Sequence, residues 1–360
     1  MQQPYFLNEA GNKKMKDGIM LWYAGKNPFI QSITGTDVTV HSTYNGEPVT
    51  QNYPNLSSAA IALQADPNTE VYIEGEITNI KNHSSEKRIV CHNTALTYLD
   101  CSSCLALTSI DLSENTEIEE IVFDFCPSLT SLDLSKNTAL TYLNCSSCSN
   151  LTSLDLSKNT ALTELNCSSC SNLTSLDLSK NTALTALYCS SCSNLTSLDL
   201  SKNTALTSID CSSCLALTSL DLSNSTALTS IDCSSCLALT SLDLSNSTAL
   251  TTINCASCSN LTSLDLSKNT ALTALYCSSC SNLTSLDLSK NTALTGSNFV
   301  DCNYIETIKY VAQNTNVAAD IARLISEAFA TDGNVYCKGT YSSTVQTAAT
   351  SKGWTYHTLE

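Results

Sequence analysis

The sequence predicts a β-solenoid with a separate cap at each end, and three observations support this prediction. A 22-residue phrase, L-T-S-L-D-L-S-K-N-T-A-L-T-x-L-x-C-S-S-C-S-N, recurs almost unchanged through most of the 360-residue chain. Within the phrase, apolar residues alternate as L-x-L or L-x-C, which is the period of a β-strand. The segments at the two ends lack the phrase. Because one coil cannot bury its own apolar face, stacked coils closed by caps are expected.

Each repeat consists of two similar halves of 11 residues. One half is Leu140-x-x-Leu143-x-Cys145-x-x-Cys148, and the next runs from Leu151 to Asn159 in the same pattern. Such halves follow one another in steps of 11 over residues 96–315, which gives ten coils. Eleven residues are enough for a short strand and a corner. Each coil is therefore predicted to contribute two short parallel strands, with Leu and Cys side chains inside.

The pattern L-x-x-L-x-L-x-x-N/C resembles that of the leucine-rich-repeat family. The short nested unit is similar to repeats in surface proteins of Bacteroides-like bacteria. The resemblance covers residues 96–315, and it implies a non-enzymatic module that recognises a protein or a glycan outside the cell or on its surface. One departure from the family pattern is that Cys replaces the usual Asn in one half, at Cys148, Cys170, Cys192 and their equivalents.

Residues 1–73 lack the repeat and are predicted to form an N-terminal α+β cap domain. Strands are expected at Ile19–Tyr23 and Ser32–Thr43, with Asn45-Gly46 as a turn, and a short helix at Ser57–Gln64. Val71–Ile80 is expected to be a strand pair that leads into the solenoid.

Residues 74–95 are predicted to be a degenerate first coil. Three residues lie 22 positions before core residues of the first regular coil. These pairs are Ile77 with Leu99, Val90 with Leu112, and Asn93 with Asn115.

Residues 316–360 are predicted to be a small αβαβ cap. An apolar face with helical period begins near Asn316. A strand at Asn334–Cys337, a helix at Ser343–Lys352 and a last strand at Trp354–His357 are expected to follow. The final Leu359-Glu360 resembles residues left by an expression vector.

The composition is acidic, with a formal net charge of −16 and only 14% charged residues. The repeats alone carry twenty acidic residues against seven lysines. Such a surface disfavours nucleic acid and anionic membranes, although it could steer a basic partner. No apolar run is long enough to span a bilayer, so membrane insertion is not expected. The start of the chain lacks the pattern of a secretory signal, and a native signal peptide is expected to have been removed.

The repeated C-x-x-C motif has three possible explanations: a zinc site, a redox pair, or core packing. The register favours packing, because the first Cys stands in the inward Leu position and the second in the Asn position. The repeats also contain no histidine. We therefore expect no metal and no cofactor. Stacked cysteines about 4.8 Å apart are too distant for an unstrained disulfide, so reduced thiols are predicted.

Aspartates recur every 22 residues from Asp111 to Asp287, at an outward position. Repulsion along this column could be relieved by lysines three residues further on, or by bound calcium. The solvated face balanced by lysine is the preferred interpretation, and a calcium-stabilised or lattice-binding repeat stays as an alternative.

A near-perfect translational repeat cannot supply the dissimilar, convergent groups that an active site needs. The flanks contain no motif of a known catalytic type, so no enzyme and no catalytic residue is predicted. The leading hypothesis is a secreted or cell-surface binding module of bacterial origin. The alternative is a structural spacer that presents the N-terminal domain.

The outward positions beside the Cys-bearing strand vary from coil to coil, whereas the opposite strand repeats Thr-Ser-x-Asp. Chemical variety and tyrosines are typical of binding surfaces. The predicted binding residues are Tyr98, Asp100, Tyr142, Asn144, Glu164, Asn166, Tyr188, Asp210, Asp232, Asn254 and Tyr276.

Overall fold

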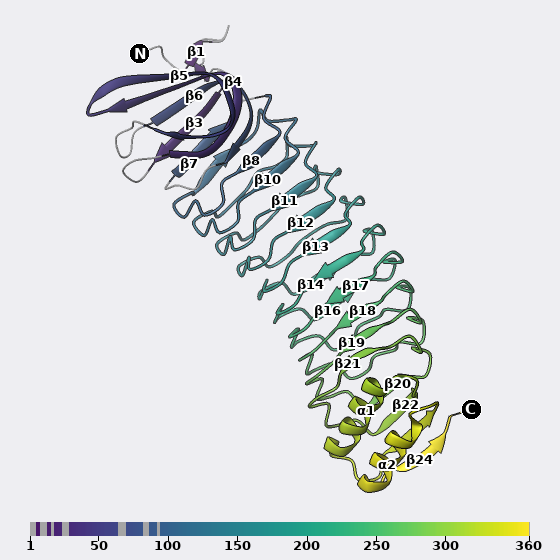
Figure 1. Ribbon diagram of the computed structural model, residues 1–360. Helices are drawn as coiled ribbons and strands as arrows, with labels where there is room; N and C mark the ends of the chain where they lie inside the picture. Colours follow the sequence, from purple (N-terminus) through teal and green to yellow (C-terminus); the bar gives the residue numbers. More distant parts are fainter. Residues whose placement is uncertain are drawn as a thin grey trace. The chain divides into compact units, whose positions relative to one another are not determined.

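The β-solenoid predicted from the repeat is confirmed by a computed structural model of the chain (Figure 1). The structure forms two compact units, Met1–Leu176 and Asp177–Glu360. It describes residues 5–7, 13–15, 18–23, 29–63, 70–81, 86–91 and 94–359.

Each of the ten coils contributes one short strand at its Cys-bearing half, which we call the Cys-side strand. In the first unit these strands are β8 (Tyr98–Asp100), β10 (Glu120–Val122), β11 (Tyr142–Asn144) and β12 (Glu164–Asn166). In the second unit they are β13 (Ala186–Tyr188), β15 (Ser208–Asp210), β17 (Ser230–Asp232), β18 (Thr252–Asn254), β19 (Ala274–Tyr276) and β21 (Gly296–Asn298).

The N-terminal strands form an antiparallel arrangement before the first coil. A long hairpin joins β4 (Phe29–Tyr44) to β5 (Glu47–Ala62). Its turn, Asn45-Gly46, has φ angles of 52° and 79°, as a two-residue hairpin turn requires. The other strands are β1 (Tyr5–Leu7), β2 (Lys13–Met15), β3 (Gly18–Tyr23), β6 (Glu70–Lys81) and β7 (Glu86–Cys91). The strands expected at Ile19–Tyr23 and Ser32–Thr43 are thus confirmed.

The helix predicted at Ser57–Gln64 is wrong, because residues 57–62 continue strand β5. In this hairpin Ile61 pairs with Ile30, and both side chains are buried. Cross-strand packing thereby overrides the local helix preference of a Ser- and Ala-rich segment.

The described part of residues 1–73 is all-β rather than α+β, and Val71–Ile80 lies in one strand, β6, rather than in a pair of strands. Gln64 and Asn93 lie outside the described residues.

A coil does precede the regular repeat, but its register differs from the predicted one. Strand β6 pairs in parallel with β8, so that Ile80 faces Leu99, and Val90 of β7 faces Asp111 of β9. The pairing that we predicted for Ile77 is therefore wrong by three residues, and that for Val90 by one. The reason is that β6 and β7 also pair with β3, and this antiparallel sheet fixes their register.

The inward residues of the repeat form the core, as the alternation predicts. All cysteines of the coils are buried, as are the leucines at the inward positions of both halves. The Cys148 Sγ donates to the Phe123 carbonyl oxygen of the preceding coil at 3.2 Å. The Asn159 Nδ2 similarly donates to the Leu134 carbonyl oxygen at 3.1 Å. The second Cys thus takes both the position and the hydrogen-bonding role of the repeat Asn.

The second strand predicted for every coil forms in only some of them. The strands on the Leu-bearing half are β9 (Ser109–Asp111), β14 (Ser197–Asp199), β16 (Ser219–Asp221), β20 (Ser285–Leu288) and β22 (Thr307–Val311). Elsewhere the same segment forms no strand, yet its leucines are buried equally well. Leu154, for example, is 6% exposed without a strand and Leu220 is 7% exposed within one. Burial of leucine is non-directional, so this side does not require a continuous hydrogen-bond ladder.

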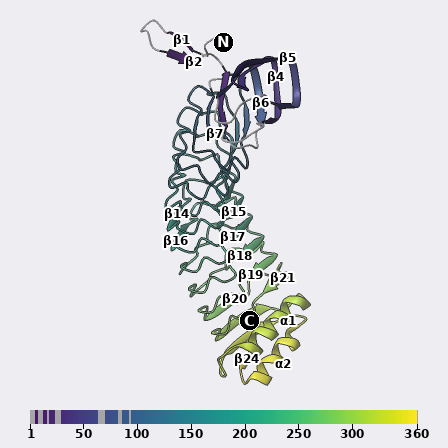
Figure 2. The same ribbon diagram turned by 90° about the vertical axis from the view of Figure 1, so that its left-hand side faces the viewer.

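The C-terminal αβαβ segment is confirmed. Helices α1 (Thr315–Glu327) and α2 (Ser342–Lys352) pack against each other, and they lie side by side in both Figure 1 and Figure 2. The Asn314 side chain caps α1 by accepting from the Val317 backbone N–H. Strand β20 continues into a four-stranded parallel sheet through β22 (Thr307–Val311), β23 (Asn334–Lys338) and β24 (Thr355–Thr358). Neither of these described helices is long and apolar enough to cross a membrane.

Candidate binding surface

In the first unit, the outward residues of the Cys-side strands stand in two columns, because the parallel strands pair in register. Each coil adds one residue to each column, so neighbours come from consecutive coils. One column is Tyr98, Glu120, Tyr142 and Glu164, and the other is Asp100, Val122, Asn144 and Asn166. Tyrosine and glutamate therefore alternate along the first column.

In the second unit, the same register separates large residues from small ones. The column of small residues is Ala186, Ser208, Ser230, Thr252 and Ala274. The column beside it is Tyr188, Asp210, Asp232, Asn254 and Tyr276. Two tyrosines thus bracket three polar residues, and Tyr276 is 38% exposed.

The Asp and Asn residues of these columns also hold the turn that follows each strand. The Asn144 Oδ1 accepts the Ser146 backbone N–H at 2.9 Å, and the Asp232 Oδ1 accepts the Ser234 N–H at 2.9 Å. This is an Asx turn, in which Asp and Asn are interchangeable. The exchange of Asp for Asn along these columns therefore keeps the side-chain oxygen that the turn needs. This part of the sequence variation is explained by structure and does not by itself indicate a binding face. The tyrosines in this column have no such oxygen, and they are the stronger binding candidates.

Asp100 does not lie on an accessible surface, contrary to our prediction. Its side chain is 4% exposed, and its Oδ2 is 2.6 Å from the Lys81 Nζ. Burial raises the pKa of this carboxyl, but hydrogen bonds from Lys81 and Ser102 outweigh burial and leave the pKa lowered. The Tyr98 hydroxyl also donates to Asp100, at 3.3 Å. The N-terminal strand β6, which supplies Lys81, occupies this end of the face.

The aspartates of the Leu-bearing half make the same turn. The Asp133 Oδ1 accepts the Ser135 N–H at 2.9 Å. The pKa of Asp133 is lowered, chiefly by the hydrogen bonds from Ser135 and further by the charge of Lys136. Each carboxylate thus has a structural partner within its own coil. Among the described residues, no group of three or more His, Cys, Asp or Glu side chains is placed to hold a metal ion.

Exposed leucines lie at three corners that the sequence analysis did not select, namely Leu105 in the first unit and Leu215 and Leu237 in the second. Leu215 and Leu237 are 46% and 43% exposed, and they follow the second Cys of consecutive coils. Most other coils have Ser there. The same two coils replace the repeat lysine by Asn224 and Asn246. These departures from the repeat consensus could have identified the two coils from the sequence. They give this stretch of the second unit a less charged and more apolar surface.

The comparisons with known proteins agree with this architecture. A family model described as the BspA type leucine rich repeat region matches in six copies, over residues 100–211 and 208–322. No curated protein matches the chain.

Several solved structures are similar. The functional domain of InlJ from Listeria monocytogenes, which includes a cysteine ladder, has 27% identity and a TM-score of 0.46, with 80% of this chain and 65% of that chain covered. The LRIM1/APL1C complex has 16% identity and a TM-score of 0.41, with 74% and 50% covered. The TLR13–ssRNA13 complex has 12% identity and a TM-score of 0.39, with 73% and 43% covered. The chain thus spans less than two thirds of the length of these proteins.

Proposed function

The chain belongs to the BspA-type leucine-rich-repeat family, and on that premise we propose that it is a non-enzymatic binding module. It recognises a protein, or a glycan, through the outward face of its Cys-side strands. The observation that carries the proposal is a contrast between the two halves of the coil. The Cys-side half forms a strand in every coil and varies outside, whereas the other half repeats nearly one sequence through the first nine coils.

Tyrosines are the anchors that we propose on this face. Tyr188 and Tyr276 each replace an Asx-turn residue, so the turn does not explain their presence. Beside them, the column of small side chains leaves room for a partner to approach the strands. Tyrosine provides a large, rigid contact area at low entropic cost, and it is enriched at interaction hot spots.

The acidity of the repeats favours a partner with a basic surface. Asp210 and Asp232 lie between the two tyrosines of the second unit, and Glu120 and Glu164 alternate with tyrosines in the first. Opposite charge accelerates association and discriminates against acidic partners. Nucleic acid is not a partner in this proposal, because its phosphates require Lys and Arg.

Secretion or display on a bacterial surface is part of the proposal. Family membership supports it, and so does a surface of polar columns and acidic turns. Labelling of intact, non-permeabilised cells with an antibody against the chain tests the location. Labelling is expected without permeabilisation, and labelling only after permeabilisation would contradict it.

The test of the binding face combines Tyr142→Ala, Tyr188→Ala and Tyr276→Ala in one chain. A fluorescent form of the protein is titrated onto cells or immobilised surface proteins of candidate partners. The triple variant is expected to lose at least about a hundredfold in affinity, since each of the three tyrosine anchors contributes about 1–2 kcal/mol.

The matched control removes two exposed tyrosines that lie elsewhere, Tyr44 and Tyr304, which are 42% and 54% exposed. This variant is expected to bind like the unmodified chain. Equal binding by the triple variant would contradict the proposed face. No binding to any candidate by the unmodified chain would favour the structural spacer instead.

A further inference from the structure

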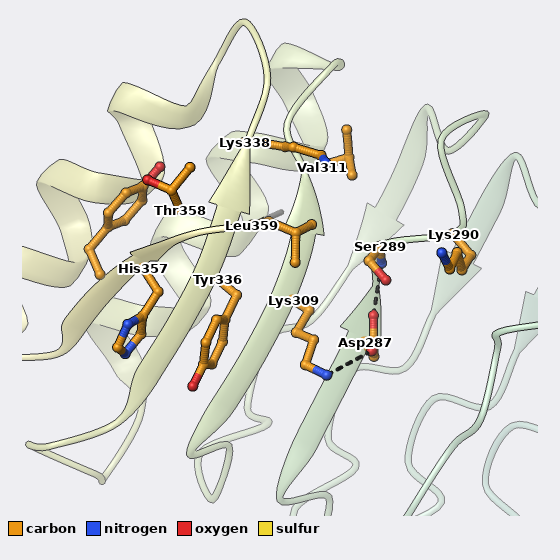
Figure 3. A pocket seen from close by; sticks show the side chains of 11 residues that line it. Asp287, Ser289, Lys290, Lys309, Val311, Tyr336, Lys338, His357, Thr358 and Leu359 are labelled. Atoms are coloured by element: carbon orange, nitrogen blue, oxygen red, sulfur yellow. Dashed lines mark hydrogen bonds and ion pairs between the residues drawn. The ribbon is translucent and has the colours of Figure 1, made fainter.

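The solvent-facing side of the C-terminal sheet contains a second candidate site, separate from the Cys-side face. Strands β20, β22, β23 and β24 pair in register, which places Asp287, Lys309, Tyr336 and His357 in one cross-strand row. Figure 3 shows this row on the exposed side of the sheet. The row forms the floor of a hollow of about 880 Å³, which Lys290 and Lys338 also line.

The charge of the aspartate column reverses at this hollow. Lys309 follows Asp287 by 22 residues and takes the outward position that aspartate holds in the preceding coils. The hollow combines three lysines with one aspartate and one histidine, in a chain whose net charge is −16. A local excess of ammonium groups on an otherwise acidic protein requires an explanation, because solubility alone does not need it.

Two of the lysines are available for a ligand. The Lys309 Nζ lies 3.4 Å from the Asp287 Oδ2, so this pair is largely neutralised. Within the part of the chain that the structure describes, the ammonium groups of Lys290 and Lys338 form no ion pair. Both side chains are exposed. In Figure 3, Lys290 lies beyond Asp287, on the side away from His357, and Lys338 lies farther along β23 than Tyr336, beside Val311.

An ordered aromatic pair lies beside these charges. The rings of Tyr336 and His357 stack with centroids 4.5 Å apart and planes 13° from parallel. The His357 Nε2 is 3.1 Å from the Asn334 Oδ1, which fixes the imidazole ring. The hollow therefore combines a rigid aromatic surface with two ammonium groups that form no ion pair among the described residues.

We propose that this hollow binds a short acidic oligosaccharide, through carboxylate groups on its sugar rings. The carboxylate groups of the sugar form ion pairs with the ammonium groups of Lys290 and Lys338. The sugar hydroxyls form hydrogen bonds with polar groups at the rim of the hollow, and one sugar ring packs against the Tyr336 ring. An extended peptide fits less well, because the backbone groups of the sheet interior already bond to each other. A long polyanion is disfavoured by the aspartate column that begins at Asp287.

Isothermal titration with a galacturonic acid oligosaccharide tests this proposal, with the neutral galactose oligosaccharide of equal length as comparison. The acidic sugar is expected to bind and the neutral sugar not to bind. Affinity is expected to fall by about tenfold in the double variant Lys290→Ala/Lys338→Ala. The control Lys180→Ala/Lys202→Ala removes two exposed lysines that do not line this hollow, and its affinity is expected to be unchanged.

Tyr336 is tested through two substitutions. Tyr336→Phe keeps the stack on His357 and is expected to retain most of the affinity, whereas Tyr336→Ala is expected to lose it. Thermal unfolding of each variant establishes that the fold persists. Substitution of the tyrosines on the Cys-side face is expected to leave this binding unchanged, so the two proposals fail independently.

Three results would overturn the proposal. One is equal binding of the neutral and acidic sugars. Another is the same affinity in the double lysine variant and its control. The third is displacement of the sugar by a short glutamate peptide or inorganic phosphate at the same concentration, which would reduce the hollow to a non-selective patch of charge.

Discussion

Asn159 shows how one polar side chain connects two coils. It is fully buried, and its Nδ2 donates to the carbonyl oxygens of Leu134 and Asn137, at 3.1 and 2.8 Å. Within their own coil these carbonyls already accept the backbone N–H groups of Asn137 and Leu140, at 3.0 and 3.3 Å, so the Asn159 amide gives each of them a second hydrogen bond, from the next coil. The residue thus replaces, at the corner, the hydrogen bonds that a sheet would supply.

Two coils lack this donor, and this leads to a prediction about stability. Ser225 and Ser247 occupy the Asn position, fully buried, and their hydroxyls have no hydrogen-bond partner among the described residues. Ser225→Asn and Ser247→Asn are each expected to raise the free energy of unfolding by about 1 kcal/mol, since Asn supplies two donors. Urea denaturation measures the change.

The reverse substitution is the control for this prediction. Asn203→Ser removes bonds to the carbonyls of Leu178 and Asn181, and it is expected to lower the free energy of unfolding by a similar amount. A loss of stability in the Ser→Asn variants would show that these two coils cannot accommodate the larger amide.

At the level of the element, the Cys-bearing half coil keeps its thiols away from solvent. Cys189, Cys211 and Cys233 are fully buried. Their pKa values are raised, first by the hydrogen bond that each thiol shares with a cysteine of the next coil and then by desolvation. A thiol with a raised pKa is protonated at neutral pH, and a protonated, buried thiol is a poor nucleophile.

The thiols are therefore expected to be unreactive in the native protein. Ellman's reagent at neutral pH should label few of the 20 cysteines in buffer and all of them in guanidinium. Mass spectrometry after alkylation identifies those that react. Few free thiols in guanidinium would contradict the prediction, because it would mean that disulfides are present.

At the scale of the whole molecule, the repeated Asx turns link stability to pH. The pKa values of Asp155, Asp177 and Asp265 are lowered, chiefly by the backbone N–H of the serine two residues on. A carboxyl with a lowered pKa in the folded state stabilises the fold above its unfolded pKa. This contribution is lost as the pH falls through the folded pKa, and each coil adds to the loss.

The melting temperature is therefore expected to stay level from neutral pH to about pH 5 and to fall below about pH 4. Acid also relieves repulsion between the carboxylates, which acts in the opposite direction. Repeating the scan at high salt screens that repulsion and should leave the acid-induced loss in place. A melting temperature that rises steadily down to pH 3 would contradict the role of the turns.

Calcium tests the alternative for the aspartate column. Because one oxygen of each carboxylate already accepts a serine N–H, we expect millimolar calcium to change the melting temperature no more than sodium chloride of equal ionic strength. Differential scanning calorimetry with and without a chelator measures this. A specific, saturable rise with calcium would instead show that the column binds the ion.

What the sequence determined by itself follows from local periodicity. Side-chain alternation within a few residues is visible in the sequence. It predicts the number of coils, the inward Leu and Cys positions and the C-terminal elements. The same alternation places Tyr142, Tyr188 and Tyr276 on one kind of strand face, although their role in binding stays a prediction.

Only the tertiary structure decided the features that depend on distant partners. Residues 57–62 form a strand because they pair with β4. Asp100 is buried because it forms an ion pair with Lys81. The Leu-bearing halves form strands in only some coils, since burial of leucine does not require a ladder. The hollow beside Lys309 needs four strands from separate parts of the second unit. In each case the deciding contact joins residues far apart in sequence, which no local pattern encodes.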